Sequence, residues 1–219
     1  MTLDGSGLAQ AIVRHCSPTL VGIKPSCLFN VPGAFAAEQK TADAHARQRA
    51  GRRRARLEAL VALANDELRG AGVCVRVLAW RHCGALVLVY RPQLLARALG
   101  AGRVASKLGE WGYVTCGRGW LEAALDRLGH ELERCHRSDP NAGFPHEVGF
   151  FLGYPYEDVM GFIEHEGRDY LCCGCWKVYS QKERAEACFA SYKRCTRACE
   201  ALLASGVSLP ELAGVRIAA

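Results

Sequence analysis

The sequence lacks any continuous apolar run of about 18 residues, the length that a membrane-spanning helix requires. It also lacks the spacings G-x-G-x-x-G and G-x-x-x-x-G-K-[ST], which argues against nucleotide chemistry by those two routes. No linker rich in proline, glycine and serine divides the chain, and no internal repeat or low-complexity tract occurs. These absences predict a single domain over residues 1–219 that has no membrane partner.

A secretion signal is also missing, although the chain has 12 cysteines. Residues 1–11 carry Asp4 and no basic residue, and they contain neither a long apolar core nor a cleavage signature. We therefore expect a cytoplasmic protein. In a reducing compartment most cysteines behave as small buried hydrophobic residues rather than as disulfides.

The formal net charge of +6 is local. It equals the charge of one arginine run, after which the rest of the chain is formally neutral; the run comprises Arg47, Arg49, Arg52, Arg53, Arg54 and Arg56. We interpret residues 36–56 as a flexible segment or as the basic start of a helix. No aromatic platform or nucleic-acid reading motif accompanies the run, so we expect a solvated helix face and no nucleic-acid partner.

Hydrophobic periodicity predicts an α+β fold, a small mixed β-sheet flanked by several helices. Strands are expected at Val73–Trp80, Ala85–Tyr90 and Tyr170–Tyr179. Helices are expected at Leu8–Arg14, Asp43–Arg69, Pro92–Leu99, Val104–Trp111, Trp120–Arg137, Pro155–Gly167 and Gln181–Ala204, and a short helix or turn is expected at Glu147–Leu152. Pro18 predicts a turn after the first helix, and the glycines and prolines of Thr19–Phe35 predict an irregular segment.

Four strings of residues resemble a known family. They are H-C-S-P-T-L-x-G-I-K-P, L-V-Y-R, F-P-H-E-V-G-x-F-L-G-Y-P and W-K-V-Y. Together they are similar to an uncharacterised bacterial family, domain of unknown function 3793, and the resemblance covers about Leu8–Leu212. It implies a cytoplasmic protein, but it brings no reaction, cofactor or catalytic residue.

One candidate chemistry is nucleophilic. A neighbouring imidazole can lower the pKa of a cysteine thiol, and Cys16 follows His15 directly. Adjacent side chains seldom point at each other, so His146 is the better candidate base, with Glu147 orienting its ring. A buried structural Cys16 and a structural His146-Glu147 pair are the alternatives. The zinc motif H-E-x-x-H is not completed, because residue 150 is Phe.

A second candidate chemistry is metal binding. Cys172 and Cys175 have the C-x-x-C spacing of zinc and iron–sulfur sites, and Cys195 and Cys199 are candidates for the second pair. The alternative is that Cys195 and Cys199 only pack in the core, because the residues on one face of the last predicted helix recur at the spacing of a buried apolar face. That face carries Cys188, Tyr192, Cys195, Cys199 and Leu202.

Near these motifs lies a third set of residues, whose long and partly apolar side chains end in a polar group. These candidate ligand-binding residues are His15, Lys24, Tyr154, Lys177 and Tyr179. We expect residues 15–25 to pack against residues 144–156, which would gather the unusual polar side chains. Three functions stay open: a ligand- or metal-handling module for which iron or haem is a candidate, a cysteine-dependent enzyme, and a non-catalytic regulatory or interaction protein.

Overall fold

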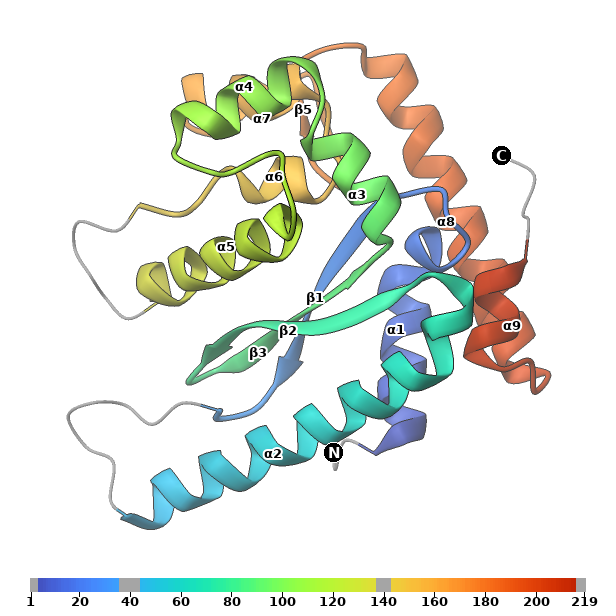
Figure 1. Ribbon diagram of the computed structural model, residues 1–219. Helices are drawn as coiled ribbons and strands as arrows, with labels where there is room; N and C mark the ends of the chain where they lie inside the picture. The colour runs from blue at the N-terminus through green and yellow to red at the C-terminus, as the bar shows by residue number, and fades with distance from the viewer. Residues whose placement is uncertain (1–3, 36–43, 137–142, 216–219) are drawn as a thin grey trace.

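The computed structural model describes residues 4–35, 44–136 and 143–215, and Figure 1 shows its α+β architecture. Helices far outnumber strands, as the sequence predicts. In chain order the elements are α1 (Gly5–Leu20), β1 (Ser26–Pro32), α2 (Ala44–Leu68), η1 (Arg69–Ala71), β2 (Cys74–Arg81), β3 (Gly84–Tyr90), α3 (Pro92–Leu99), α4 (Gly102–Glu110), α5 (Trp120–His136), α6 (Val148–Phe151), α7 (Tyr156–Glu164), β4 (Cys172–Cys173), β5 (Lys177–Val178), α8 (Lys182–Ala204) and α9 (Leu209–Gly214).

The main sheet has the strand order β1-β3-β2, and both pairings are antiparallel. The prediction of a mixed sheet is therefore wrong. The strands predicted at Val73–Trp80 and Ala85–Tyr90 are confirmed as β2 and β3, and a turn at residues 82–83 joins them into a hairpin. The continuous apolar run of β3 is also explained, because the central strand is covered on both faces.

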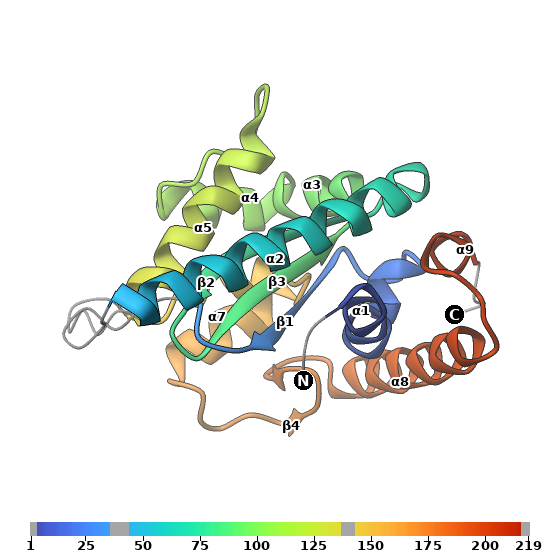
Figure 2. The same ribbon diagram turned by 90° about the horizontal axis from the view of Figure 1, so that it is seen from below.

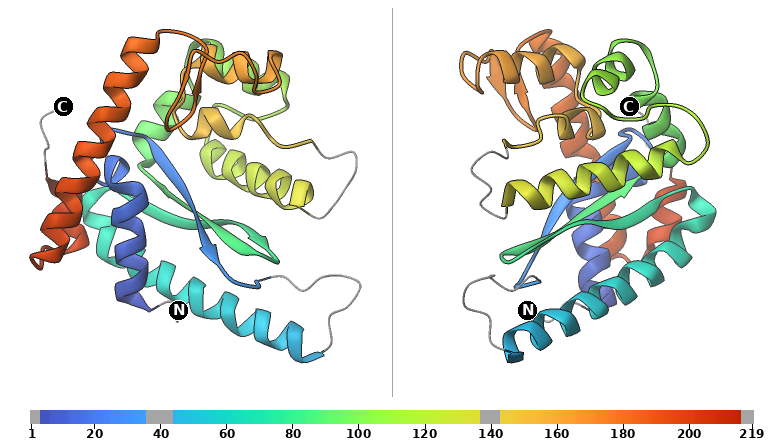
Figure 3. Two further views of the ribbon diagram at one scale, coloured as in Figure 1. Left: turned by 180° about the vertical axis from the view of Figure 1, so that it is seen from behind. Right: turned by 60° about the vertical axis from the view of Figure 1, so that its left-hand side comes forward.

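Helices cover the two faces of this sheet with separate hydrophobic cores. One core joins α1, α2, α8 and α9 to the sheet, through residues such as Val87 and Val89. The other core joins α3 to α7 to the opposite face, through residues such as Leu88 and Tyr90. Figure 3 shows the sheet between α2 and α5, and Figure 2 shows α1 lying beside α8.

Helix α1 is longer than predicted. It continues through Pro18 to Leu20, whereas the sequence predicts an end at Arg14 and a turn. Its last turns are buried, and the Ser17 hydroxyl donates a hydrogen bond of 2.5 Å to the Val13 carbonyl. Burial of this segment outweighs the local restriction that proline places on the residue before it.

Strand β1 lies in the segment that the sequence predicts to be irregular, so this prediction is wrong. Pairing with β3 overrides the turn residues in it. Proline cannot donate to a sheet, but Pro32 is the last residue of an edge strand, where the lost donor is tolerated.

The predicted strand Tyr170–Tyr179 is instead a small hairpin of two-residue strands, β4 and β5. Gly174 is at its turn, where its amide donates to the Trp176 carbonyl over 3.1 Å. A Cβ atom on Gly174 would lie 2.2 Å from the Phe189 ring, so only glycine fits here.

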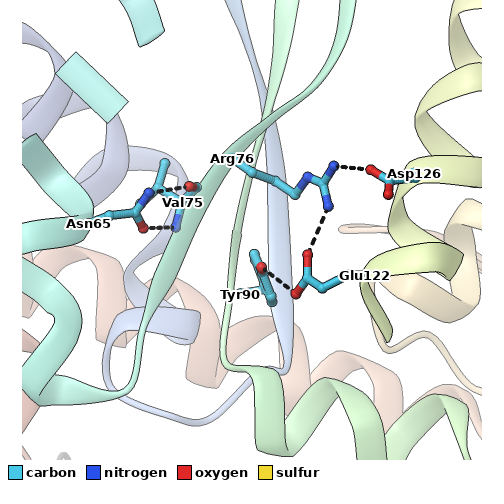
Figure 4. A network of polar contacts seen from close by, with 6 residues as sticks. All are labelled: Asn65, Val75, Arg76, Tyr90, Glu122 and Asp126. Carbon is cyan, nitrogen blue, oxygen red and sulfur yellow. Dashed lines mark hydrogen bonds and ion pairs between the residues drawn. The ribbon is translucent and has the colours of Figure 1, made fainter. Parts of the chain in front are cut away.

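Side-chain hydrogen bonds connect the sheet to helices on both sides (Figure 4). The Asn65 amide bonds to both the N–H and the C=O of Val75, at 2.7 Å each, and so joins α2 to β2. From β2, the Arg76 guanidinium contacts Glu122 at 3.1 Å and Asp126 at 2.6 Å, which joins β2 to α5. These contacts fix the frame that carries the site.

The basic run forms the start of α2, as one of the two interpretations predicts; residues 36–43 lie outside the described ranges. Five of its six arginines are exposed, and Arg54 is half-buried with its guanidinium 5.2 Å from the centre of the Trp80 ring. Among the described residues, no helix is long and apolar enough to cross a membrane.

Candidate functional site

The predicted packing of residues 15–25 against residues 144–156 is confirmed in the part nearest β1. The Lys24 ammonium lies 5.2 Å from the centre of the Tyr154 ring. A Cβ atom on Gly153, whose φ is +71°, would lie 2.5 Å from Pro25. Next to them, the Ser26 hydroxyl donates to the Phe151 carbonyl over 2.5 Å.

Two neighbouring cavities lie along this contact. The first, here called the basic cavity, measures about 400 Å³ and is lined by His15, Lys24, Lys193 and Arg197 among others. The second, here called the aromatic cavity, measures about 320 Å³ and is lined by apolar and aromatic side chains, including Phe144, Phe162 and Trp176. Tyr154 and Cys175 line both cavities, and the Tyr154 hydroxyl donates to the Cys175 carbonyl over 3.2 Å.

Lys24 is the most unusual residue of the basic cavity, since only 7% of its surface is exposed. Its ammonium lies 5.2 Å from the centre of the Tyr154 ring and 5.8 Å from that of Tyr192. No carboxylate pairs with it in the part of the chain that the structure describes, and no described Asp or Glu lines the cavity. Lys193 and Arg197 add to the same sign of charge, whereas burial and the neighbouring Arg14 lower the pKa of His15 and favour its neutral form.

Two thiols meet at the wall of the basic cavity. Cys27 lines it from β1, whereas Cys16, on α1, is fully buried and does not line it. Burial raises the pKa of Cys16 well above its ordinary value, and the interaction with Cys27 adds to this effect. The interaction with Cys16 lowers the pKa of Cys27 to about 6 against the effect of burial, and the positive charge of Lys24 adds to this lowering.

Cys16 and His146 are not brought together. Cys16 interacts with Cys27, whereas His146 lines the aromatic cavity with its ring 5.5 Å from that of Phe144 and 5.2 Å from that of Phe162. Glu147 does not orient His146 but accepts a hydrogen bond of 3.0 Å from the Tyr113 hydroxyl. The predicted nucleophile and base therefore occupy separate places.

The other predicted ligand-binding residues divide between the cavities. His15 and Lys24 line the basic cavity, Lys177 lines the aromatic cavity, and Tyr154 lines both. Lys177 is engaged by the protein itself, since its ammonium donates to the Gly167 carbonyl over 2.6 Å and lies 4.9 Å from the centre of the Tyr170 ring.

Tyr179 lines neither of these two cavities. Its ring stacks on that of His165 at 5.5 Å and packs against Gly161 of α7. Its hydroxyl is buried and has no hydrogen-bond partner in the described ranges. Burial raises its pKa.

The four candidate metal ligands do not converge. Cys172 and Cys175 lie on the β4–β5 hairpin, whereas Cys195 and Cys199 lie on α8 and belong to the core that α8 forms with α1. Within the described ranges, no group of three or more His, Cys, Asp or Glu side chains is arranged to hold a metal ion. Burial of Cys195 and Cys199 agrees with the packing alternative.

Sequence reasoning missed Asp158, a carboxylate with only 2% of its surface exposed. It accepts hydrogen bonds from Trp176 Nε1 at 2.7 Å, from the amides of Tyr179 and Ser180 at 2.9 Å each, and from the Ser180 hydroxyl at 3.1 Å. These bonds tie the β4–β5 hairpin to α7. Two of its partners, Trp176 and Tyr179, belong to the W-K-V-Y string. The sequence gives no sign that this string contacts Asp158.

Cys27 and Tyr192 were also missed, although both line the basic cavity. Cys27 lies in the strand that sequence reasoning takes for an irregular segment. Tyr192 was placed on the core face of the last helix, where it is half-buried and faces the Lys24 ammonium. A lysine followed by proline and then by a strand gives no local signal for such a cavity.

The fold and these cavities define a helix-rich α+β protein that carries two adjacent cavities over one edge of a small antiparallel sheet. The chain belongs to the family described as protein of unknown function DUF3793, whose model matches residues 12–213. This confirms the resemblance drawn from the sequence strings. Comparisons with curated proteins and with solved structures gave no match.

Proposed function

We propose that this protein is a ligand-binding module whose basic cavity holds a small anion bearing carboxylate or phosphate groups. The observation that carries the proposal is the nearly buried side chain of Lys24, which lines the cavity and has no carboxylate partner among the described residues. Removing a charge from water costs several kcal/mol unless an opposite charge accompanies it.

The contacts that Lys24 makes do not offset this cost. Each of its two aromatic contacts contributes about 0.5–2 kcal/mol. An anion in the cavity would supply the missing charge, and Lys193 and Arg197 at the same cavity would attract it further. The Cys27 sulfur, when ionised, is the competing internal partner.

The proposal does not extend to iron or haem. The candidate thiolates and His146 are distributed over separate places, so no described set of side chains favours a metal over an organic or phosphate anion. It also leaves out a Cys16–His146 enzyme. A module that binds an anion without catalysis falls within the regulatory alternative.

The test measures binding of inorganic phosphate and of citrate to the full chain by calorimetry, at constant ionic strength set with chloride. We expect saturable binding of at least one of them. Lys24→Met should weaken it about tenfold or more, because a charge-assisted contact contributes about 1.5–3 kcal/mol.

The matched control is Lys177→Met, which removes an ammonium already satisfied by the Gly167 carbonyl. It should leave the affinity unchanged. Absence of saturable binding to the wild-type chain, or equal affinity of wild type and Lys24→Met, contradicts the proposal. Cys27→Ser tests whether a bound anion or the ionised Cys27 sulfur is the partner of the Lys24 ammonium. Binding of the anion to this variant should persist and strengthen, because the competing thiolate is gone.

A further inference from the structure

Aromatic rings from three parts of the chain meet at the aromatic cavity. Phe144 and His146 precede α6, Phe162 belongs to α7, and Trp176 belongs to the β4–β5 hairpin. The His146 ring contacts both of its neighbours, at 5.5 Å from that of Phe144 and 5.2 Å from that of Phe162. Phe144 nevertheless keeps 53% of its surface exposed. An apolar ring that enters this cavity would remove such surface from water, which is favourable.

The charged residues of the aromatic cavity are satisfied by the fold itself. Lys177 donates to the Gly167 carbonyl over 2.6 Å, and Asp158 accepts four hydrogen bonds. Neither side chain needs a charged group of a ligand as its partner. The cavity therefore favours an uncharged, flat group, because aromatic rings gain further stabilisation from stacked and edge-to-face contacts with one another.

The two cavities lie close enough together for one small molecule. Tyr154 and Cys175 line both of them. The centre of the Tyr154 ring lies 5.2 Å from the Lys24 ammonium, which belongs to the basic cavity. It also lies 4.8 Å from the centre of the Trp176 ring, which belongs to the aromatic cavity. The side chain of one tyrosine therefore connects the ammonium to the ring-lined wall.

We infer that the two cavities bind one ligand, in which a carboxylate or phosphate group is joined to a planar aromatic ring. The anionic group lies in the basic cavity beside Lys24, and the ring lies in the aromatic cavity among Phe144, Phe162 and Trp176. The position of the anionic group rests on the proposed function. The position of the ring rests separately on the aromatic wall and on the charges that the fold satisfies.

The test compares phosphate monoesters that share the anionic group and differ in what is attached to it. Methyl phosphate has no ring, whereas phenyl phosphate and 3-phenylpropyl phosphate carry a phenyl ring at two distances from the phosphate. Calorimetry on the full chain at about pH 8, where all three are dianions, measures their affinities at constant ionic strength. At least one phenyl compound should bind about tenfold or more tightly than methyl phosphate, because burial of a phenyl ring stabilises a complex by at least that factor.

Variants of the wall assign the ring to the aromatic cavity. Phe144→Ala removes an exposed side chain and should cost little stability, and Phe162→Leu keeps an apolar side chain without its ring. Each should reduce the advantage of the phenyl compound over methyl phosphate by about threefold or more. The matched control is Leu171→Ala, which removes an exposed apolar side chain that lines neither cavity. It should leave all affinities unchanged.

Two further comparisons test the two halves of the ligand. Lys24→Met removes the charge but not the aromatic wall, so it should weaken methyl phosphate and the phenyl compound by the same factor, about tenfold or more. The ratio of their affinities should persist. The cyclohexyl analogue of the tighter phenyl compound should bind less tightly than that compound, because a saturated ring does not stack on aromatic side chains.

The outcomes distinguish this inference from the proposed function. Equal affinity of methyl phosphate and both phenyl compounds overturns the inference but keeps the proposed function. An advantage of the phenyl ring that persists in both Phe144→Ala and Phe162→Leu, or that the cyclohexyl analogue shares in full, also overturns it. Binding of the phenyl compounds that depends on Phe144 and not on Lys24 contradicts the proposed function but keeps the aromatic site.

Discussion

The basic and aromatic cavities are similar in size and share two wall residues, but they differ in how their buried polar groups are satisfied. In the aromatic cavity, Lys177 donates to a carbonyl and Asp158 accepts four hydrogen bonds. In the basic cavity, Lys24 has two aromatic rings and a thiol beside it.

This difference distinguishes polar groups that stabilise the fold, in the aromatic cavity, from a polar group that is open to a ligand, in the basic cavity. A buried charge that the fold itself satisfies needs no ligand, and its removal should cost stability. A nearly buried charge that no carboxylate or carbonyl of the fold satisfies, and that has only an ionised thiol as a competing partner, is open to a ligand, and its removal should cost binding. Each variant can therefore be assigned to one cavity by which of the two quantities it changes.

The largest expected effect on stability is that of Asp158→Ala. The change leaves Trp176 Nε1 and two backbone amides without their acceptor. Each unsatisfied buried donor costs about 1–3 kcal/mol, so the free energy of unfolding should fall by about 3 kcal/mol or more. Urea denaturation measures this fall.

Asp158→Asn is the matched variant, because it keeps one acceptor oxygen and replaces the other by a donor. Its free energy of unfolding should lie between that of the wild type and that of Asp158→Ala. Phosphate affinity should stay at the wild-type level in both variants wherever they remain folded. A specific loss of affinity in the folded Asp158→Asn protein would contradict the separation of the cavities.

The next effect concerns pH and the Cys27 thiol. An ordinary cysteine has a pKa of about 8.5, whereas that of Cys27 lies at about 6. Alkylation of Cys27 by iodoacetamide should therefore reach half its limiting rate near pH 6. Peptide mapping after short exposures measures this midpoint, and a midpoint near pH 8.5 would contradict the lowered pKa.

Stability should follow the same linkage. The folded-state pKa of Cys27 lies below its unfolded value, so its contribution is present above the unfolded pKa and is lost as pH falls through about 6. The opposite shift of Cys16 should reduce stability as pH rises past the unfolded pKa. Cys27→Ser should remove the rise of stability between pH 6 and about 8.5.

Periodic signals predicted the parts of the fold that depend on local pattern. The apolar spacing of α2 and the alternation of β2 with the run of β3 gave the long helix and the hairpin nearly to the residue. Strand β1 could not be predicted, because Asn30 and Pro32 are unfavourable locally and only pairing with β3 makes them a strand. Tertiary context overrides weak propensity here.

The candidate site was predicted in composition but not in arrangement. Lys24 and Tyr154 were selected as polar tips on apolar stems, and the structure does place them in contact. The pairing of Cys16 with Cys27 could not be predicted, because it depends on α1 continuing past Pro18 and on the missed strand. Asp158 was missed for the same reason, since its partners come from another segment.

The smallest expected effect is that of Tyr154→Phe, at the wall between the two cavities. The variant loses the hydrogen bond of 3.2 Å to the Cys175 carbonyl but keeps the ring that faces Lys24. A single hydrogen bond contributes about 0.5–1.5 kcal/mol, so stability in urea should fall by about that amount. Phosphate affinity should change little, because the cation–π contact depends on the ring and not on the hydroxyl. A large loss of affinity at unchanged stability would show instead that the hydroxyl itself contacts the anion, and the shared wall would then belong to the binding site.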